Sequence, residues 1–152
     1  MEMLETQSIH AFLAFFEKLK SEQTKAAQVI LREQNVQQAK EKAKTLQEAG
    51  QEHPKFLQLS TLVEKQIKER ADMRIIIFAS YRTTVDCIID MLTKKGIKAG
   101  KLVGQKEGQS QKEQIQMIQN FGAGMFNCLV TTNIGEEGLS IAGADTAIFY
   151  DN

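Results

Sequence analysis

The feature that most constrains the fold is an uninterrupted apolar run, Ile75-Ile76-Ile77-Phe78-Ala79. Strands with this pattern are buried on both faces, as in parallel sheets that carry helices on both sides. The run is also far shorter than the ~18 apolar residues that a membrane span needs. We therefore expect an α/β protein that does not cross a membrane.

The segments after this run alternate between helical and strand patterns. Helices are predicted over residues 83–95 and from residue 110 through Phe121, where Ser110 and Glu113 have the spacing of a capping box. Short strands are predicted at residues 99–103, 128–132 and 146–150. Because the connections are too long for hairpins, we predict a parallel β-sheet with helices on both faces.

The first third of the chain has a different character. Only Gly50 of the ten glycines falls in the first 95 residues, and apolar residues recur there at helical spacing. We predict helices over residues 8–20 and 22–49, forming a hairpin that Gly50 ends, and a further helix from Pro54 to about Arg70. The predicted domains are therefore residues 1–50 and residues 51–152.

The charge balance limits the classes of partner. Nineteen basic residues match nineteen acidic ones, so any nucleic-acid affinity must come from a few placed groups. The two cysteines and two histidines lack the spacing of a zinc site or a disulfide framework, and we expect no metal site. The N-terminus lacks a secretory pattern, so we expect an intracellular protein, cytoplasmic if prokaryotic and nuclear if eukaryotic.

Polar residues follow three of the predicted strands, where ligands gather in such sheets. These residues are Ser80, Tyr81 and Arg82 after the first strand, Gly104 and Gln105 after the second, and Thr131 and Thr132 after the third. Hydroxyl, aromatic and guanidinium groups suit phosphate oxygens and sugar or base faces, and a glycine lets a backbone approach closely. Taken singly, each has an ordinary alternative: capping for Ser80 and Thr132, and a surface ion pair for Arg82.

Taken in order, these features resemble a known family. The segments are residues 74–82, 103–105, 110–114, Phe121, Gly124 and residues 129–141. Over residues 54–152 they resemble the second RecA-like domain of superfamily 2 helicases. The Gly-Gln, Ser-Gln-Lys-Glu-Gln and Glu-Glu-Gly features are similar to the fork-remodelling branch, which contains the archaeal helicase-nuclease Hef and the Fanconi anaemia group M translocase.

The resemblance implies roles for individual residues. Residues 78–82 match motif IV, whose end lies against the nucleic-acid backbone, and Thr132 matches the motif V threonine that contacts a phosphate. Gly104 and Gln105 lie where a neighbouring loop approaches the same strand. Glu137, Gly138 and Ser140 match the part of motif V that faces ATP. The family usually has aspartate where Ser140 stands, and a serine brings no charge to this contact.

Other parts of a helicase motor are missing from the sequence. It has no G-x-x-x-x-G-K-[ST] loop and no D-E-x-[HD] box, which in the family belong to the first motor domain, and motif VI would follow Asn152. We therefore expect a fragment without catalytic residues that alone binds neither ATP nor Mg²⁺, although the full-length enzyme would use both. Its expected partners are forked or branched DNA and the first RecA-like domain of the same chain. The hairpin would be part of a helical insertion.

Two other functional classes remain open at this point. The first is a non-catalytic RecA-like module that serves as a docking platform for protein or nucleic acid. The second is a small-molecule enzyme on a flavodoxin-like sheet, which the absence of a nucleophile-base pair and of a G-x-G-x-x-G turn weakens. Glu136 and Glu137 are adjacent acids near the predicted site, but neighbours on a helix do not share a face, so paired catalysis is not expected.

Overall fold

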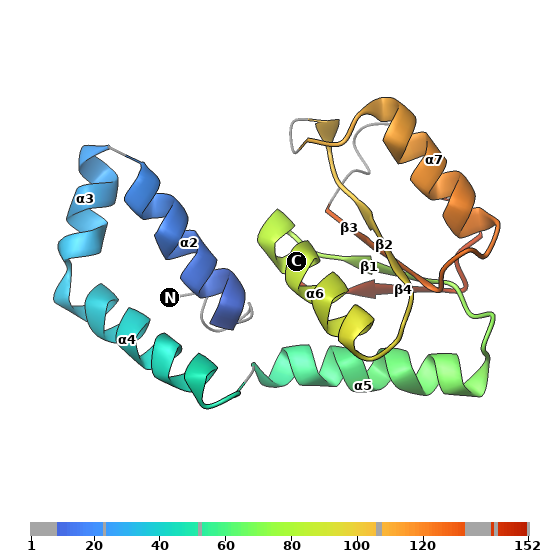
Figure 1. Cartoon of the computed structure of the whole chain (residues 1–152), viewed down its shortest axis with the longest axis horizontal. Coiled ribbons are helices and arrows are strands. Elements are labelled where there is room, and N and C mark those ends of the chain that lie inside the picture. The colour runs from blue at the N-terminus through green and yellow to red at the C-terminus, as the bar shows by residue number, and fades with distance from the viewer. Residues whose placement is uncertain are drawn as a thin grey trace. The chain divides into compact units, whose positions relative to one another are not determined.

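The computed structural model describes residues 9–22, 24–51, 53–105, 108–132, 141 and 143–151 (Figure 1). The chain divides into two compact units, Met1–Leu57 and Gln58–Asn152, and each has its own apolar cluster. Helix α5, Pro54–Glu69, crosses the boundary between these units.

The N-terminal unit is built from three described helices, α2 (Ile9–Ser21), α3 (Lys25–Arg32) and α4 (Gln34–Glu48). Helix α2 contacts both of the others. It supplies three of the five buried members of the apolar cluster, which are Phe12, Phe16, Leu19, Ala27 and Ala43. Burial of this cluster, rather than helix propensity alone, stabilises three helices of such short length.

The single helix predicted over residues 22–49 is divided in the structure. Glu33 has an extended conformation (φ −60°, ψ 127°) and separates α3 from α4. A straight helix would place Ala27 and Ala43 about 24 Å apart along its axis. The break lets both alanines join the same cluster beside Phe12 and Phe16. Gly50, at φ +67°, follows the end of α4 as predicted.

The C-terminal unit contains a four-stranded sheet in which every pairing is parallel. The strands are β1 (Ile75–Phe78), β2 (Ala99–Leu102), β3 (Cys128–Thr131) and β4 (Thr146–Phe149). Their order is β2-β3-β1-β4, so β1 and β3 lie in the centre and β2 and β4 at the edges. The central position of β1 explains why its residues form a continuous apolar run.

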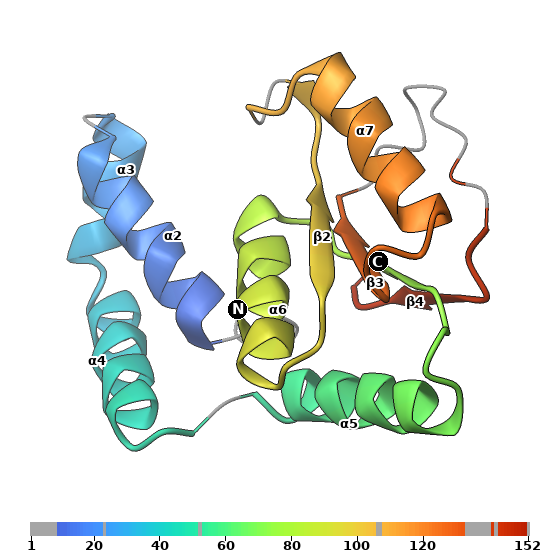
Figure 2. The same cartoon turned by 45° about the vertical axis from the view of Figure 1, so that its right-hand side comes forward.

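Helices cover both faces of the sheet, as predicted. Figure 2 shows α6 (Arg82–Lys94) and α7 (Gln111–Gly122) on opposite sides of it. Phe121 of α7 is completely buried in one cluster with Ile76, Leu102 and Leu129. Helix α6 contacts β2 and β3. The structure therefore confirms the predicted fold class, with a helical segment before a parallel α/β sheet.

Two local features fix the position of α7. The predicted capping box is present: the Ser110 hydroxyl accepts from the Glu113 N–H at 3.3 Å, and the Glu113 carboxylate accepts from the Ser110 N–H at 2.8 Å. On the sheet, Gly100 leaves room for two side chains, because an added Cβ would lie 2.5 Å from the Phe126 ring and 2.7 Å from the Met117 sulfur. Gly100 thus permits the close packing of Phe126 and Met117 against β2.

A candidate nucleic-acid interface at the carboxyl edge of the sheet

The carboxyl ends of the four strands are joined in one line by backbone hydrogen bonds. The Thr132 N–H donates to the Leu102 carbonyl at 3.4 Å, and the Ala79 N–H donates to the Thr131 carbonyl at 2.9 Å. On the far side of β1, the Tyr150 N–H donates to the Phe78 carbonyl at 2.9 Å. The segments that leave the strands therefore start from a common edge.

The segment after β1 is accessible to a ligand. Ser80 and Tyr81 are exposed, and Arg82, the first residue of α6, has a side chain that is 52% exposed. The alternative interpretation of Arg82 as a surface ion pair corresponds to a contact with Asp86, in which the Arg82 Nε lies 4.0 Å from a carboxylate oxygen. Exposed pairs of this kind contribute about 0–1 kcal/mol, so a phosphate can compete for the guanidinium.

The loop after β2 is open where a backbone could approach. A Cβ built on Gly104 would meet no atom within 4 Å, and Gln105 is exposed. Two amides hold the start of this loop. The Val103 N–H donates to the Gln109 Oε1 at 2.8 Å, and the buried Gln114 Nε2 donates to the Val103 carbonyl at 2.7 Å.

Gln109 and Gln114 were not assigned these positioning roles from the sequence. For Gln114 a signal exists, because it stands seven residues before Phe121 and therefore on the same face of α7. A glutamine on the buried face of a helix needs a hydrogen-bond partner, and here the partner is the end of β2.

The two threonines at the end of β3 are buried. Thr131 is fully buried, and its hydroxyl donates to the Thr132 carbonyl at 2.8 Å. Thr132 is only 7% exposed. A contact between Thr132 and nucleic acid therefore requires the nucleic-acid backbone to come close to the end of β3. The Thr131 hydroxyl already has an acceptor within the protein.

The predicted ATP-facing residues Glu137, Gly138 and Ser140 lie outside the described residues. Within the residues that the structure describes, no group of histidine, cysteine, aspartate or glutamate side chains could hold a metal ion. Burial raises the pKa of the Cys128 thiol to about 12, which keeps it protonated at neutral pH. The same part of the chain has no helix both long and apolar enough to cross a membrane.

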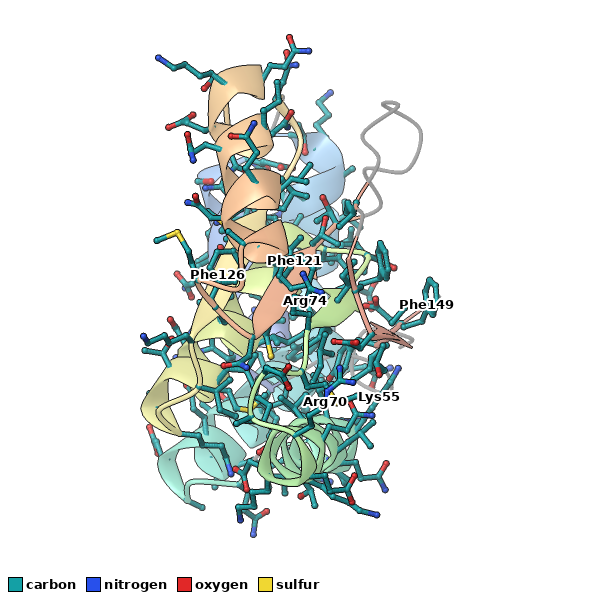
Figure 3. The ribbon with its side chains drawn as sticks, turned by 90° about the vertical axis from the view of Figure 1, so that its right-hand side faces the viewer. Lys55, Arg70, Arg74, Phe121, Phe126 and Phe149 are labelled. Atoms are coloured by element: carbon teal, nitrogen blue, oxygen red, sulfur yellow. The ribbon has the colours of Figure 1, made fainter. Side chains whose placement is uncertain are left out.

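A cavity of about 470 Å³ lies at the opposite, amino edge of the sheet. Its lining includes Arg74, Lys98, Met125 and Asn127, and none of the predicted site residues. The Arg74 guanidinium donates to the Gly122 carbonyl at the end of α7, at 2.8 Å. Figure 3 shows Arg74 together with Arg70; both bond to Asp145, Arg74 through its backbone N–H and Arg70 through its guanidinium. This edge is built from internal polar contacts that join the sheet to α7.

The comparison with known families decides the identity of the domain. The family described as "Helicase conserved C-terminal domain" matches residues 54–152. The chain belongs to this helicase family.

The relatives extend the similarity to the N-terminal unit. The helicase domain of Hef from Pyrococcus furiosus matches with a TM-score of 0.75 and 36% identity, over 99% of this chain and 32% of that chain. MJ1505 of Methanocaldococcus jannaschii, whose name gives it as an ATP-dependent RNA helicase, is 40% identical over 99% of this chain and 19% of its own length. The ATP-dependent DNA helicase mph1 of Neurospora crassa is 42% identical over 65% of this chain and 9% of its own length.

These similarities confirm the predicted branch. The chain is a C-terminal RecA-like helicase domain, with its preceding helical segment, of the superfamily 2 branch that contains Hef and the Fanconi anaemia group M protein. It spans about a fifth of the length of MJ1505 and about a third of the Hef helicase chain.

Proposed function

We propose that this chain is part of an ATP-dependent DNA helicase or translocase that acts on forked or branched DNA in repair. Its contribution is to bind the nucleic-acid backbone through motifs IV and V. The observation that carries the proposal is the common carboxyl edge of the sheet. Strands β1 and β2 both pair with β3, so the exposed residues after β1 and the open loop after β2 start from the same edge.

The chemistry of this edge suits a phosphate backbone rather than base edges. Arg82 offers a charged donor, Ser80 and Thr132 offer hydroxyls, and Gln105 offers an amide. Tyr81 adds an exposed aromatic face on which a sugar or base can lie. Contacts of this type position a strand without reading its sequence, so we expect little sequence preference.

We propose the domain roles from the family resemblance. Residues 51–152 act as part of the second motor domain, and residues 1–50 form part of a helical insertion. The partner is the first RecA-like domain of the same protein, and closure of the two domains around ATP steps them along a DNA strand.

We propose that ATP and Mg²⁺ are held mainly by that first domain. The sequence of this chain has no G-x-x-x-x-G-K-[ST] loop and no D-E-x-[HD] box, the features that hold ATP and Mg²⁺ in the first motor domain of the family. When bound, ATP would supply the chemistry of phosphoryl transfer to water, whose free energy drives repeated closing and opening of the two domains. The segment that includes Glu137, Gly138 and Ser140 would face the nucleotide from this side.

The proposal is tested by phosphate release from ATP with forked DNA in excess. The intact protein, with both motor domains, should hydrolyse ATP in response to forked DNA, and the 152-residue chain alone should not exceed ~1 turnover per second, an ordinary enzymatic rate. Forked RNA and linear duplex DNA serve as comparison substrates. Stimulation by RNA alone would overturn the DNA assignment, and an intact protein without nucleic-acid-dependent hydrolysis would favour the docking-platform alternative.

A further inference from the structure

The carboxylate of Asp86 stands between two cations from different elements. Its Oδ1 accepts from the Lys101 ammonium of β2 at 2.5 Å, and its Oδ2 lies 4.0 Å from the Arg82 guanidinium, one turn earlier on α6. Lys101 was not singled out by any sequence motif. The Asp86 carboxylate therefore links Lys101 to Arg82, the cation that we propose contacts the nucleic acid.

The position of Lys101 brings its ammonium toward the carboxyl edge. Lys101 is the third residue of β2 and pairs in register with Val130, immediately before the Leu102–Thr131 pair that ends both strands. Helix α6 begins at this edge with Arg82 and contacts β2. The Lys101 side chain bridges from the strand to the first turns of that helix.

The charges and exposures of the cluster favour exchange with an external anion. The Asp86 carboxylate contacts two cations, and the three side chains together contribute two positive charges and one negative charge. The side chains of Arg82, Asp86 and Lys101 are 52%, 48% and 30% exposed. Pairs this exposed contribute little stability, so replacing Asp86 by a phosphate oxygen costs little.

We propose that Lys101 is a second phosphate-binding cation of the DNA interface, and that Asp86 is the internal counter-ion that Lys101 and Arg82 exchange for DNA phosphates. This inference rests on the proposed function, because it adds a residue to the same carboxyl edge. A cation that neutralises one phosphate releases about one counterion, so Lys101 contributes to the salt dependence of binding.

The test is fluorescence anisotropy of the intact protein with a labelled forked DNA across a salt series. Lys101→Ala should lower the slope of log affinity against log salt by about one, and Lys101→Arg should keep it. Lys98→Ala is the matched control, because Lys98 is an exposed lysine that immediately precedes β2 at the amino edge. It should leave the slope unchanged.

Asp86→Asn tests the counter-ion role in the opposite direction. Removing one negative charge about 4 Å from a bound phosphate should strengthen binding about fivefold at low salt. A variant that merely folds less well cannot bind more tightly, so a gain in affinity excludes a structural explanation. Weaker or unchanged binding by Asp86→Asn would overturn the counter-ion role.

Arg82→Ala in the same series separates this inference from the proposed function. If Arg82→Ala lowers the slope and Lys101→Ala, with an unchanged melting temperature, does not, the Lys101 contact is wrong and the carboxyl-edge interface stands. If neither variant lowers the slope, the proposed interface itself is wrong. An equal loss in Lys98→Ala would show that the effect of Lys101 is only one of overall charge, which also overturns the inference.

Discussion

Asp145 and Arg74, 71 positions apart in the sequence, are joined twice at the amino edge of the sheet. The Arg74 N–H donates to the Asp145 carboxylate and the Asp145 N–H donates to the Arg74 carbonyl, both at 2.8 Å. At the other end of the same strand pair, the Ser80 N–H donates to the Asp151 carboxylate at 2.6 Å. Aspartates thus bind β4 to β1 at both ends and align the carboxyl edge that we propose contacts DNA.

The bond at the amino edge should make stability depend on pH. The hydrogen bond from Arg70, and then that from the Arg74 backbone, hold the pKa of Asp145 below its ordinary value of 3.8. A lowered pKa stabilises the fold while the pH is above 3.8, and this contribution is lost as the pH falls below that value, because the unfolded state takes up the proton first.

Asp145→Asn should therefore lower the melting temperature at pH 7, and its deficit relative to the wild type should shrink as the pH falls from about 5 to 3. Thermal melts followed by circular dichroism across that range measure this deficit. The other carboxylates with lowered pKa values, such as Glu64 and Glu113, titrate in both proteins, so the difference isolates Asp145. A deficit that stays constant with pH would contradict the assignment.

Gly100→Ala should destabilise the sheet by about 1–3 kcal/mol, because the new methyl group would overlap Phe126 and Met117. Urea unfolding gives the change in free energy. Gly122→Ala is the control, since a Cβ there meets nothing within 4 Å, and helical alanine should leave stability unchanged or raise it by up to about 1 kcal/mol. Equal losses in the two variants would show that packing against β2 is not the cause.

Gly104→Ala should separate binding from folding. The space beside Gly104 is open, so its added methyl group should leave the melting temperature unchanged. If a DNA backbone approaches this loop, the same methyl group should weaken binding by the intact protein. Anisotropy titrations measure the affinity, and unchanged DNA affinity would remove Gly104 from the interface.

Arg82→Ala and Thr132→Val should affect DNA binding in different ways. Arg82→Ala should weaken binding by a similar factor on unrelated sequences and lower the salt slope by about one, because it removes a charge. Thr132→Val should weaken binding with little change in slope, because it removes a neutral donor. Melting temperatures are measured alongside, since Thr132 is buried. A loss of affinity by Arg82→Ala on only one of two DNA sequences would argue against a backbone contact.

Local patterns predicted the fold because they depend on burial and on neighbouring residues. The apolar run from Ile75 to Ala79 predicted a strand buried on both faces, and the capping-box spacing of Ser110 and Glu113 predicted the start of α7. The polar residues that follow the predicted strands also predicted which side chains would lie at the same edge of the sheet. Arg82 is one of them, and its side chain is half exposed.

Features that depend on distant partners were not predictable in this way. The break at Glu33 follows from packing of Ala27 and Ala43 on α2, and no local breaker marks it. Two contacts could be predicted only by knowing which elements meet in the fold. One is the hydrogen bond of Asp145 to the residue before β1, and the other is the contact of Asp86 with Lys101. The burial of Thr131 likewise follows from the central position of β3 in the strand order.

The central claim is that DNA lies along the carboxyl edge of the sheet, and photocrosslinking tests it most directly. Tyr81 at the carboxyl edge and Met125 beside the amino-edge cavity are both well exposed, 49% and 63%. The photoreactive residue p-benzoylphenylalanine is placed at either position in the intact protein and irradiated with forked DNA. We expect crosslinks from position 81 and none from position 125. Crosslinks from position 125 alone would place the DNA at the amino edge and contradict the account.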